Sequence, residues 1–249
     1  MSRLLRKLSL PAFGLLVLVL CSVPGLLEPV LRLLFPGNAE LVYRRASIGR
    51  LIVEHLYLVG LSSIAAAVVG LLIGIGVTRT SGRAFLPLAQ DASSLAQTFP
   101  PVAVLALAVP IFGFGFRPTV IALFIYSVLP VVKNTIAGLE AVPADLKEAS
   151  VGMGMRPVQL LVGTELPLAA HVIMAGIRTS VVVNVGTATI GATIGAGGLG
   201  RVIIAGLVRD NTAWVLTGAV AAATLALMVD WALARIESGF YSANGIGSG

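Results

Sequence analysis

Long apolar runs separated by short polar stretches dominate the pattern of the chain. Runs that are uncharged, or contain one or two charges, are long enough to cross a bilayer core, which takes about 20 helical residues. They cover residues 8–27, 56–78, 92–116, 118–138, 167–190 and 211–229. The second helix is expected to begin near Leu51, and the third contains Pro100, Pro101 and Pro110, which kink a spanning helix. The pattern predicts an all-α integral membrane protein with about six transmembrane helices.

Composition supports this fold class. Of the 249 residues, 57% are hydrophobic and 11% are charged, whereas a soluble domain has about 25% charged residues. This excludes a water-soluble protein, and the high hydrophobicity excludes a disordered one. The net charge of +6 comes from Lys and Arg in short stretches between the apolar runs, which is typical of membrane flanks rather than of a nucleic-acid-binding face. Cys21 is the only cysteine, so no intrachain disulfide can form.

The charge distribution also predicts an orientation. Six spans place both ends on one side, and the basic N-terminus and the basic turn at residues 79–83 favour cytoplasmic N- and C-termini. We therefore expect a multi-pass protein of a prokaryotic plasma membrane, in contact with lipid. We expect residues 1–50 to form the first helix and an outer linker, residues 51–238 a five-helix unit with a cytoplasmic loop over residues 140–166, and residues 239–249 a flexible tail.

The loop between the fourth and fifth spans is unusually polar. Residues 140–165 contain four of the eleven acidic residues. Pro143 and Asp145 favour the start of a helix there, and Gly152 and Gly154 favour its end. One face of this helix would present Leu146, Ala149, Ser150 and Met153. A helix lying on lipid usually has a basic polar face, but this one is mixed and acidic, which favours docking to a partner protein.

A longer motif runs through this loop: Glu148-Ala149-Ser150, three residues, Gly154, nine residues, Thr164-Glu165-Leu166-Pro167. It resembles the EAA loop of ATP-binding-cassette importer permeases, whose pattern is EAA, three residues, G, nine residues, I-x-L-P. Ser150 replaces the second alanine of that pattern and Thr164 replaces its isoleucine. Further matching motifs are Gln97-Thr98-Phe99-Pro100-Pro101, Leu129-Pro130, Ala175-Gly176-Ile177-Arg178-Thr179 and Ile194-Gly195-Ala196-Gly197-Gly198-Leu199-Gly200. Together they cover residues 47–235 and are most similar to permeases for glycine betaine, choline and related osmoprotectants.

The resemblance implies a five-helix core of the methionine-importer permease type with one extra N-terminal helix. Two permease subunits, identical or different, would form the pathway for a small quaternary amine. An extracytoplasmic binding protein would deliver the substrate, and a cytoplasmic ATP-binding subunit would dock on each loop. The residues implied in this coupling are Glu148, Ala149, Ser150, Gly154, Leu166 and Pro167.

The ATPase itself is expected to be a separate protein. The chain contains no G-x-x-x-x-G-K-[ST] phosphate-binding loop. We therefore expect this chain to be no enzyme and to bind no cofactor, with ATP and Mg²⁺ bound by the partner.

Polar residues inside the spans are candidates for the pathway. Arg178 lies about eleven residues into the fifth span, where a charge faces a wet cavity or the bundle interior. It could line the pathway or pair with backbone carbonyls. Asn184 and Thr187 on the same helix, and Gln97 and Thr98 beside the proline kink, could line the pathway or form interhelical hydrogen bonds.

Other functions fit the sequence less well. The pattern Gly195-x-Gly197-x-x-Gly200 matches a dinucleotide fingerprint, but it follows an apolar span and lacks an acid about 20 residues later. An ion-coupled transporter usually has acidic residues within its spans, and the mid-span regions here contain none. Neither a nucleophile–base pair nor a metal-ligand pattern points to an intramembrane enzyme. An importer of the same class for another small solute, such as an amino acid, remains an alternative.

Overall fold

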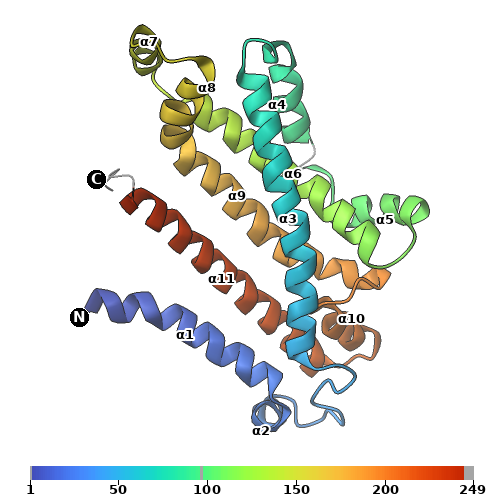
Figure 1. Ribbon diagram of the computed structural model, residues 1–249. Coiled ribbons are helices and arrows are strands. Elements are labelled where there is room, and N and C mark those ends of the chain that lie inside the picture. Colours follow the sequence, from blue (N-terminus) through green and yellow to red (C-terminus); the bar gives the residue numbers. More distant parts are fainter. Residues whose placement is uncertain (1, 96–97, 244–249) are drawn as a thin grey trace. The chain divides into compact units, whose positions relative to one another are not determined.

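The computed structural model describes residues 2–95 and 98–243, and all regular structure in these ranges is helical (Figure 1). Long helices alternate with short connecting ones. In chain order the elements are α1 (Ser2–Ser22), α2 (Pro24–Leu34), α3 (Ile48–Thr78), η1 (Arg83–Phe85), α4 (Leu86–Leu95), α5 (Pro101–Phe112), α6 (Phe116–Glu140), α7 (Ala144–Gly152), α8 (Pro157–Leu160), η3 (Leu161–Glu165), α9 (Leu166–Ala188), η4 (Ile190–Ile194), α10 (Gly200–Val208) and α11 (Thr212–Ala243). The predicted all-α fold class is confirmed.

The helices long and apolar enough to cross a membrane number four in the described part of the chain. They are Ile48–Thr78, Phe116–Glu140, Pro157–Ala188 and Thr212–Ser238. A bent pair, Leu10–Ser22 with Pro24–Leu34, would make a fifth, and Pro101–Phe112 is a shorter apolar helix. The predicted number of six is therefore approximate, and the apolar runs 56–78, 118–138 and 211–229 are found in α3, α6 and α11.

The first apolar run, predicted to be one helix over residues 8–27, does not continue through Pro24. α1 ends at Ser22, α2 begins at Pro24, and the two helices meet at 88°. Val23 between them is extended, with φ −106° and ψ 103°. A proline disfavours helical backbone at the preceding residue and cannot donate the hydrogen bond that would continue the helix.

The third run, predicted to be one kinked span over residues 92–116, forms two helices. α4 ends at Leu95 and α5 begins at Pro101, while residues 96 and 97 lie outside the described residues. The adjacent Pro100 and Pro101 explain the break, since both lack a backbone N–H. α5 has 12 residues, about 18 Å of helix, which is short for a bilayer core.

The fifth spanning helix begins at Pro157, well before the start predicted at Pro167. α8, η3 and α9 follow one another without a break, and η3 is a π-helical turn in which the N–H of Leu166 bonds the Leu161 carbonyl. Pro167 explains this turn, because its ring would clash with the carbonyl of Gly163 in a regular α-helix.

Chain contacts divide the protein into two compact units, which we describe separately. Unit 1 comprises Met1–Ser62, Pro101–Leu123 and Val181–Ile236. Its core surrounds Trp214, which is 2% exposed and packs edge-on against Tyr43 with ring centroids 5.2 Å apart. Asn211 ties the linker before α3 to the start of α11, because its Nδ2 donates to the Glu40 carbonyl and its Oδ1 accepts from the Trp214 N–H. The linker is thus packed into the unit.

Unit 2 comprises Ser63–Pro100, Phe124–Ser180 and Glu237–Gly249, as far as these residues are described. Its helices approach closely where glycines face them. A Cβ on Gly74 of α3 would lie 2.5 Å from the Thr135 Cβ of α6, and one on Gly138 of α6 would lie 3.1 Å from the Ala169 carbonyl oxygen of α9. Small residues at such crossings are typical of membrane helix packing.

Candidate functional site

The polar loop of unit 2 contains the predicted helix, α7. It spans Ala144–Gly152, with Pro143 immediately before it and Asp145 in its first turn. An acidic residue there interacts favourably with the positive end of the helix dipole. The predicted helix is confirmed.

Gly154 ends α7 through a defined cap. Its φ is +86°, its N–H bonds the Val151 carbonyl at 2.9 Å, and the N–H of Met155 bonds the Ser150 carbonyl at 3.2 Å. This pair of bonds is a Schellman motif, which requires a left-handed residue that is usually glycine. Gly152, by contrast, is the last residue of the helix itself. The glycine of the EAA-like motif is therefore a backbone requirement.

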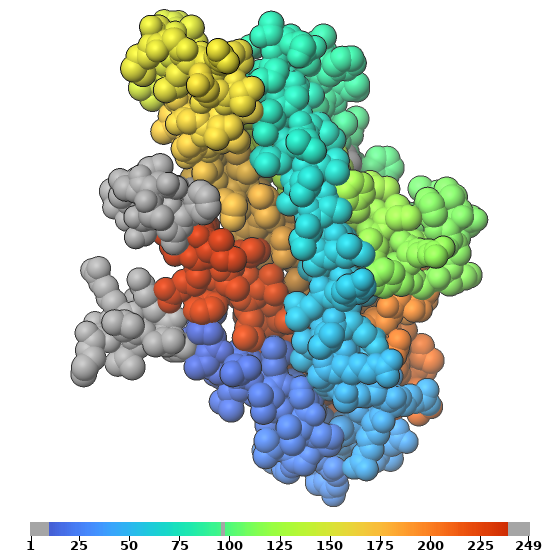
Figure 2. Space-filling view, viewed as in Figure 1, coloured from blue at the N-terminus to red at the C-terminus, as the bar shows by residue number. Residues whose placement is uncertain are grey.

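Much of α7 and of the segment that follows it is open to the surroundings. Val151 is 58% exposed and Met153 73%, and Val158 in the following α8 is 71% exposed. The surface in Figure 2 shows this segment, coloured yellow, with its side chains at the surface. The predicted apolar stripe is thus not buried within the chain, except at Ser150, which is 5% exposed. An exposed apolar helix face marks a site of interaction.

Two side chains of α7 attach the helix to η3 and α6. The Ser150 Oγ donates to the Leu146 carbonyl at 2.8 Å and lies 3.2 Å from the Thr164 Oγ1 of η3. The Lys147 Nζ donates to the Leu139 carbonyl at 3.0 Å. These contacts hold the helix from one side only.

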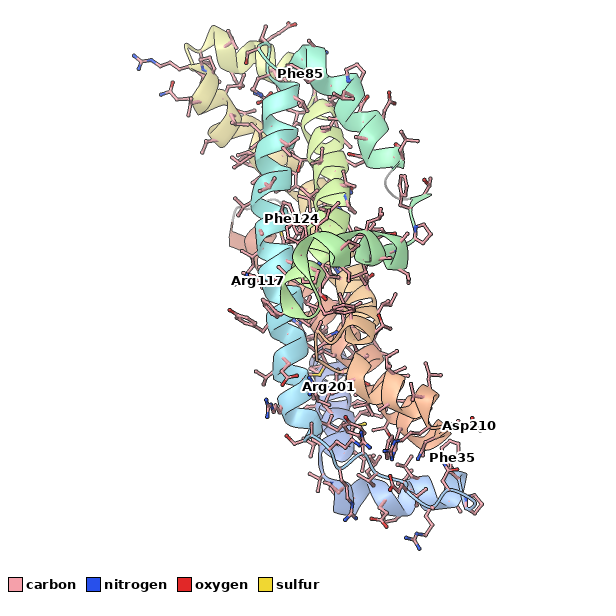
Figure 3. The ribbon with its side chains drawn as sticks, turned by 90° about the vertical axis from the view of Figure 1, so that its right-hand side faces the viewer. Phe35, Phe85, Arg117, Phe124, Arg201 and Asp210 are labelled. Carbon is pink, nitrogen blue, oxygen red and sulfur yellow. The ribbon has the colours of Figure 1, made fainter. Side chains whose placement is uncertain are left out.

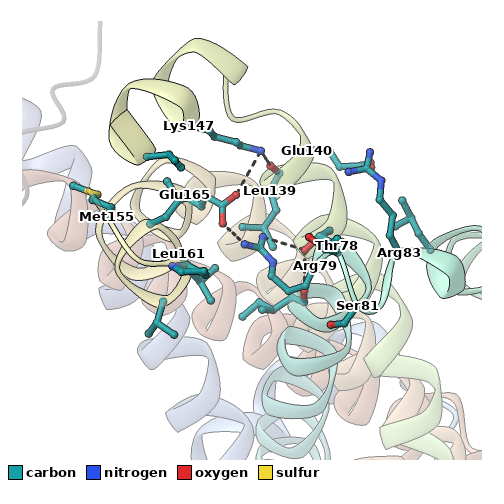
Figure 4. Close-up of a pocket in the computed structure, with 17 residues that line it drawn as sticks. Thr78, Arg79, Ser81, Arg83, Leu139, Glu140, Lys147, Met155, Leu161 and Glu165 are labelled. Carbon is teal, nitrogen blue, oxygen red and sulfur yellow. Dashed lines mark hydrogen bonds and ion pairs between the residues drawn. The ribbon is translucent and has the colours of Figure 1, made fainter. Parts of the chain in front are cut away.

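Next to these contacts lies a cluster of ion pairs around Glu165 (Figure 4). The carboxylate of Glu165 is 5% exposed and accepts from the Arg79 Nη1 at 2.5 Å, with the Lys147 Nζ 3.6 Å from its other oxygen. Arg79 follows α3, so the cluster joins the end of α3, η3 and α7. It borders a cavity of about 1010 Å³. A buried carboxylate between two cationic side chains holds those partners in place.

Arg178 pairs with a carboxylate. Its Nη1 lies 3.5 Å from the Glu237 Oε2 of α11, and His171 Nδ1 lies 3.0 Å from the Glu237 Oε1. From the sequence, Arg178 was expected either to line the pathway or to pair with backbone carbonyls. The sequence analysis did not identify Glu237 as its partner. The spacing of His171 and Arg178, two helical turns apart on one face, was a signal that they share a partner.

The remaining pathway candidates occupy different surroundings. Asn184 is fully buried and its Nδ2 donates to the Ser62 Oγ of α3 at 3.2 Å, an interhelical hydrogen bond. Thr187 is 9% exposed. Thr98 is exposed and its Oγ1 donates to the Leu95 carbonyl at 2.6 Å. Gln97 lies outside the described residues.

The glycine-rich segment of unit 1 forms a loop before α10. In Figure 3 the label Arg201 marks the beginning of α10, and the label Asp210 marks the chain just after its end. Gly195, Gly197 and Gly198 all have positive φ. The loop is held by the start of α3: the Glu54 carboxylate accepts from the Gly198 N–H and the buried His55 Nδ1 accepts from the Leu199 N–H, both at 3.3 Å.

Two observations bear on whether His55 or the glycine-rich loop could bind a metal ion or a nucleotide. The His55 Nε2 lies 2.9 Å from the Val185 carbonyl, so both ring nitrogens are used within the protein. Among the described residues, no group of three or more His, Cys, Asp or Glu side chains could hold a metal ion. The glycines serve a tight backbone path, and the chain continues into α10 without a preceding strand.

The chain is similar to known transport proteins. Residues 66–240 match the model of the family described as binding-protein-dependent transport system inner membrane component. The osmoprotectant import permease proteins OsmW and OsmY of Salmonella typhimurium are 39% and 42% identical over 74% and 73% of this chain, covering 87% and 77% of their own lengths. The choline transport system permease protein OpuBB of Bacillus subtilis is 37% identical over 84% of this chain and 92% of its own.

The fold is shared with a solved importer. The permease chain in the inward-facing MetNI methionine ABC transporter aligns over 78% of this chain and 95% of its own, with a TM-score of 0.69 and 23% identity. This likeness shows that the two chains share a fold. The chain belongs to the family of binding-protein-dependent transport system inner membrane components, and it is a multi-pass membrane protein.

Proposed function

We propose that this chain is the permease subunit of an importer for a small quaternary amine of the glycine betaine or choline class. The observation behind this substrate class is the 37–42% identity to osmoprotectant and choline permeases over at least 73% of the chain. A second permease subunit, identical or different, completes the pathway. An extracytoplasmic binding protein delivers the substrate.

In this proposal α7 docks a separate cytoplasmic ATPase, which binds ATP and Mg²⁺. The support is geometric: α7 is attached through Lys147 and Ser150, and its side turned away from these residues presents the exposed Glu148 and Ala149. The motif residues Glu148, Ala149 and Gly154 lie on or directly after this helix. The contact to the ATPase would use the exposed face.

The cytoplasmic location of α7 follows from charge. Arg79 pairs with Glu165, so the basic turn after α3 and the polar loop lie at the same end of unit 2, on one side of the membrane. Basic residues in short loops mark the cytoplasmic side. The N- and C-termini are assigned to that side as well, on the basis of the basic N-terminus.

The test is uptake of labelled glycine betaine and choline into proteoliposomes containing the chain with its native partner proteins. We expect uptake that requires ATP and the binding protein. Copurification of an ATPase without uptake of either amine would keep the importer and refute the substrate class, and labelled amino acids would then be tried. Uptake driven by an ion gradient without an ATPase would refute the proposal.

Gly154 offers a sharper test of the docking role. A residue with a Cβ finds open space there, but it must adopt φ +86°, which costs about 1–2 kcal/mol for a non-glycine residue. Gly154→Val should therefore distort the end of α7 and lower ATP-dependent uptake severalfold. Gly152→Ala is the matched control, because Gly152 also faces open space but is helical. Equal uptake by both variants would contradict a docking role for α7.

Arg178 is proposed to support transport by holding α9 to the end of α11 through Glu237. Arg178→Ala should lower uptake at equal expression, because it removes the cation that faces a poorly exposed carboxylate. Arg178→Lys keeps the charge and should retain most of the uptake. Wild-type uptake by Arg178→Ala would remove this residue from the mechanism.

A further inference from the structure

The EAA-like motif departs from the family pattern at Ser150 and Thr164, and the structure brings these residues into contact. Their hydroxyl oxygens are 3.2 Å apart, although the residues are 14 positions apart in the chain. The Ser150 hydroxyl has one proton, which it donates to the Leu146 carbonyl. The Thr164 hydroxyl can donate to Ser150, and its other polar neighbour is the Met155 Sδ at 3.8 Å.

The two departures compensate each other in volume. The family pattern has alanine and isoleucine where this chain has serine and threonine. Serine adds one heavy atom to alanine, and threonine has one fewer than isoleucine, so the pair keeps its total number of side-chain atoms. The two positions thus keep their heavy-atom count, and in this chain they carry two hydroxyl groups in contact.

The next residue of η3 adds a second attachment. Thr164 contacts Ser150, and Glu165 faces Lys147, which lies one helical turn before Ser150 on the same side of α7. Glu165 also binds Arg79 after α3. We name these five residues the α7 anchor: Arg79, Lys147, Ser150, Thr164 and Glu165. Val151 lies one helical turn after Lys147 and lines the same cavity as Lys147 and Glu165. The side of α7 turned away from the anchor presents Glu148 and Ala149, which are both exposed.

The anchor connects α7 to a spanning helix at an irregular turn. Thr164 and Glu165 are the last two residues of the π-helical η3, which continues directly into α9. π-turns are frequent at functional sites. A displacement of α7 is therefore transmitted to α9 by the Ser150–Thr164 and Lys147–Glu165 contacts, in addition to the covalent chain.

We propose that the α7 anchor positions α7, the helix on which the ATPase docks, and that Ser150 and Thr164 act as a matched pair within the anchor. The anchor residues act through α7 and are positioning residues; the proposal rests on the docking function of α7. Breaking the hydroxyl pair should lower the amount of substrate transported per ATP hydrolysed. Replacing both residues by the family pair should restore it.

The test is a double-mutant cycle in the reconstituted complex with its ATPase and binding protein. Ser150→Ala, Thr164→Ile and the double variant are compared with wild type for transport per ATP hydrolysed. We expect each single variant to lose about threefold to tenfold, in the range of coupling energies between contacting residues, and the double variant to return to within about twofold of wild type. Losses that multiply in the double variant would overturn the matched pair.

Two further variants keep the test decisive. Thr164→Val removes the hydroxyl without adding bulk, so it should lower the transport ratio even if Thr164→Ile disturbs folding. Ser94→Ala is the matched control, because the exposed Ser94 donates to the Gln90 carbonyl at 3.0 Å in the same manner as Ser150 to Leu146. Unchanged coupling in both Thr164→Val and Ser150→Ala would refute the anchor.

A label reports the position of α7 independently of transport. Cys21 is 5% exposed and is the only cysteine, so a spin label on Val151→Cys can be made specific. The label should become more mobile when Ser150→Ala is added, and regain its order when Thr164→Ile is added as well. If wild type binds no ATPase at all, the docking proposal fails; if it binds and transports while the cycle shows no coupling, the anchor alone fails.

Discussion

Two loops of this protein use glycines for different physical reasons. In the loop before α10, a Cβ on Gly198 would lie 2.8 Å from the His55 Nδ1, and one on Gly200 would meet the Thr189 carbonyl. In the loop after α7, a Cβ on Gly154 would meet nothing within 4 Å. The first loop lacks space for a side chain at Gly198 and Gly200, in addition to the positive φ of Gly195, Gly197 and Gly198. The second loop needs glycine for its backbone angle alone.

The two loops also differ in how far other residues enclose them. The loop before α10 is bonded to Glu54 and to His55, which is fully buried. The helix before Gly154 is exposed at Val151 and Met153. A tightly enclosed loop serves the stability of its unit, whereas an exposed helix with a precise end can present a face to a partner. Substitutions in the first should therefore act on folding, and those in the second on assembly.

Gly200→Ala should show the largest effect on stability. The added methyl group would overlap backbone atoms of Thr189, which cannot move as a flexible side chain would, and overpacking of this kind costs about 3 kcal/mol. The melting temperature of the purified protein in detergent should fall clearly. Gly186→Ala is the control, since Gly186 lies in α9 with open space around it. A melting temperature equal to wild type for Gly200→Ala would contradict the enclosed loop.

His55→Ala should have the next largest effect. It leaves the Leu199 N–H and the Val185 carbonyl without the ring nitrogens near them, and an unsatisfied buried group costs about 1–3 kcal/mol. His55→Gln places an amide where it can reach one of these partners, so its melting temperature should lie between those of His55→Ala and wild type. If all three proteins melt together, the ring does not hold the loop.

Val151→Asp should leave the melting temperature unchanged and weaken ATPase binding. Val151 is 58% exposed, so a charge there disturbs no core, but the charge would lose its hydration where a docked ATPase covers this end of α7. The loss should be about fivefold to thirtyfold in Kd, measured by titrating the ATPase onto the permease in nanodiscs. Val208→Asp is the control, because Val208 is 81% exposed in unit 1. Equal affinities for both variants would show that α7 is not the docking face.

Local patterns in the sequence were sufficient for much of the fold. The apolar runs predicted α3, α6 and α11 because twenty apolar residues in succession must be buried or lie in lipid. In the polar loop, Pro143, Asp145 and the helical spacing of Leu146, Ala149, Ser150 and Met153 predicted α7. The EAA-like motif singled out Gly154, which the structure shows to cap this helix. These features depend on residues within one or two turns of each other.

Prolines show the limit of such patterns. Their presence predicted disturbed helices, but the tertiary structure decided the outcome in each case. Pro24 begins a helix at 88° to the preceding one, Pro101 begins the separate α5, and Pro167 is accommodated by the π-turn of η3. A proline removes one hydrogen bond wherever it lies, and the packing around it selects among a bend, a break and a bulge.

The sequence by itself determined the membrane class, the helical fold and the family resemblance, because hydrophobic length and short motifs are local properties. Only the tertiary structure decided that Ser150 meets Thr164, that Arg79 and Lys147 share Glu165, and that His55 holds the loop before α10. These partners are 14 to 144 residues apart or belong to different helices. Their contacts depend on how the helices pack, and packing is set by the summed fit of many side chains, which no single segment of sequence contains.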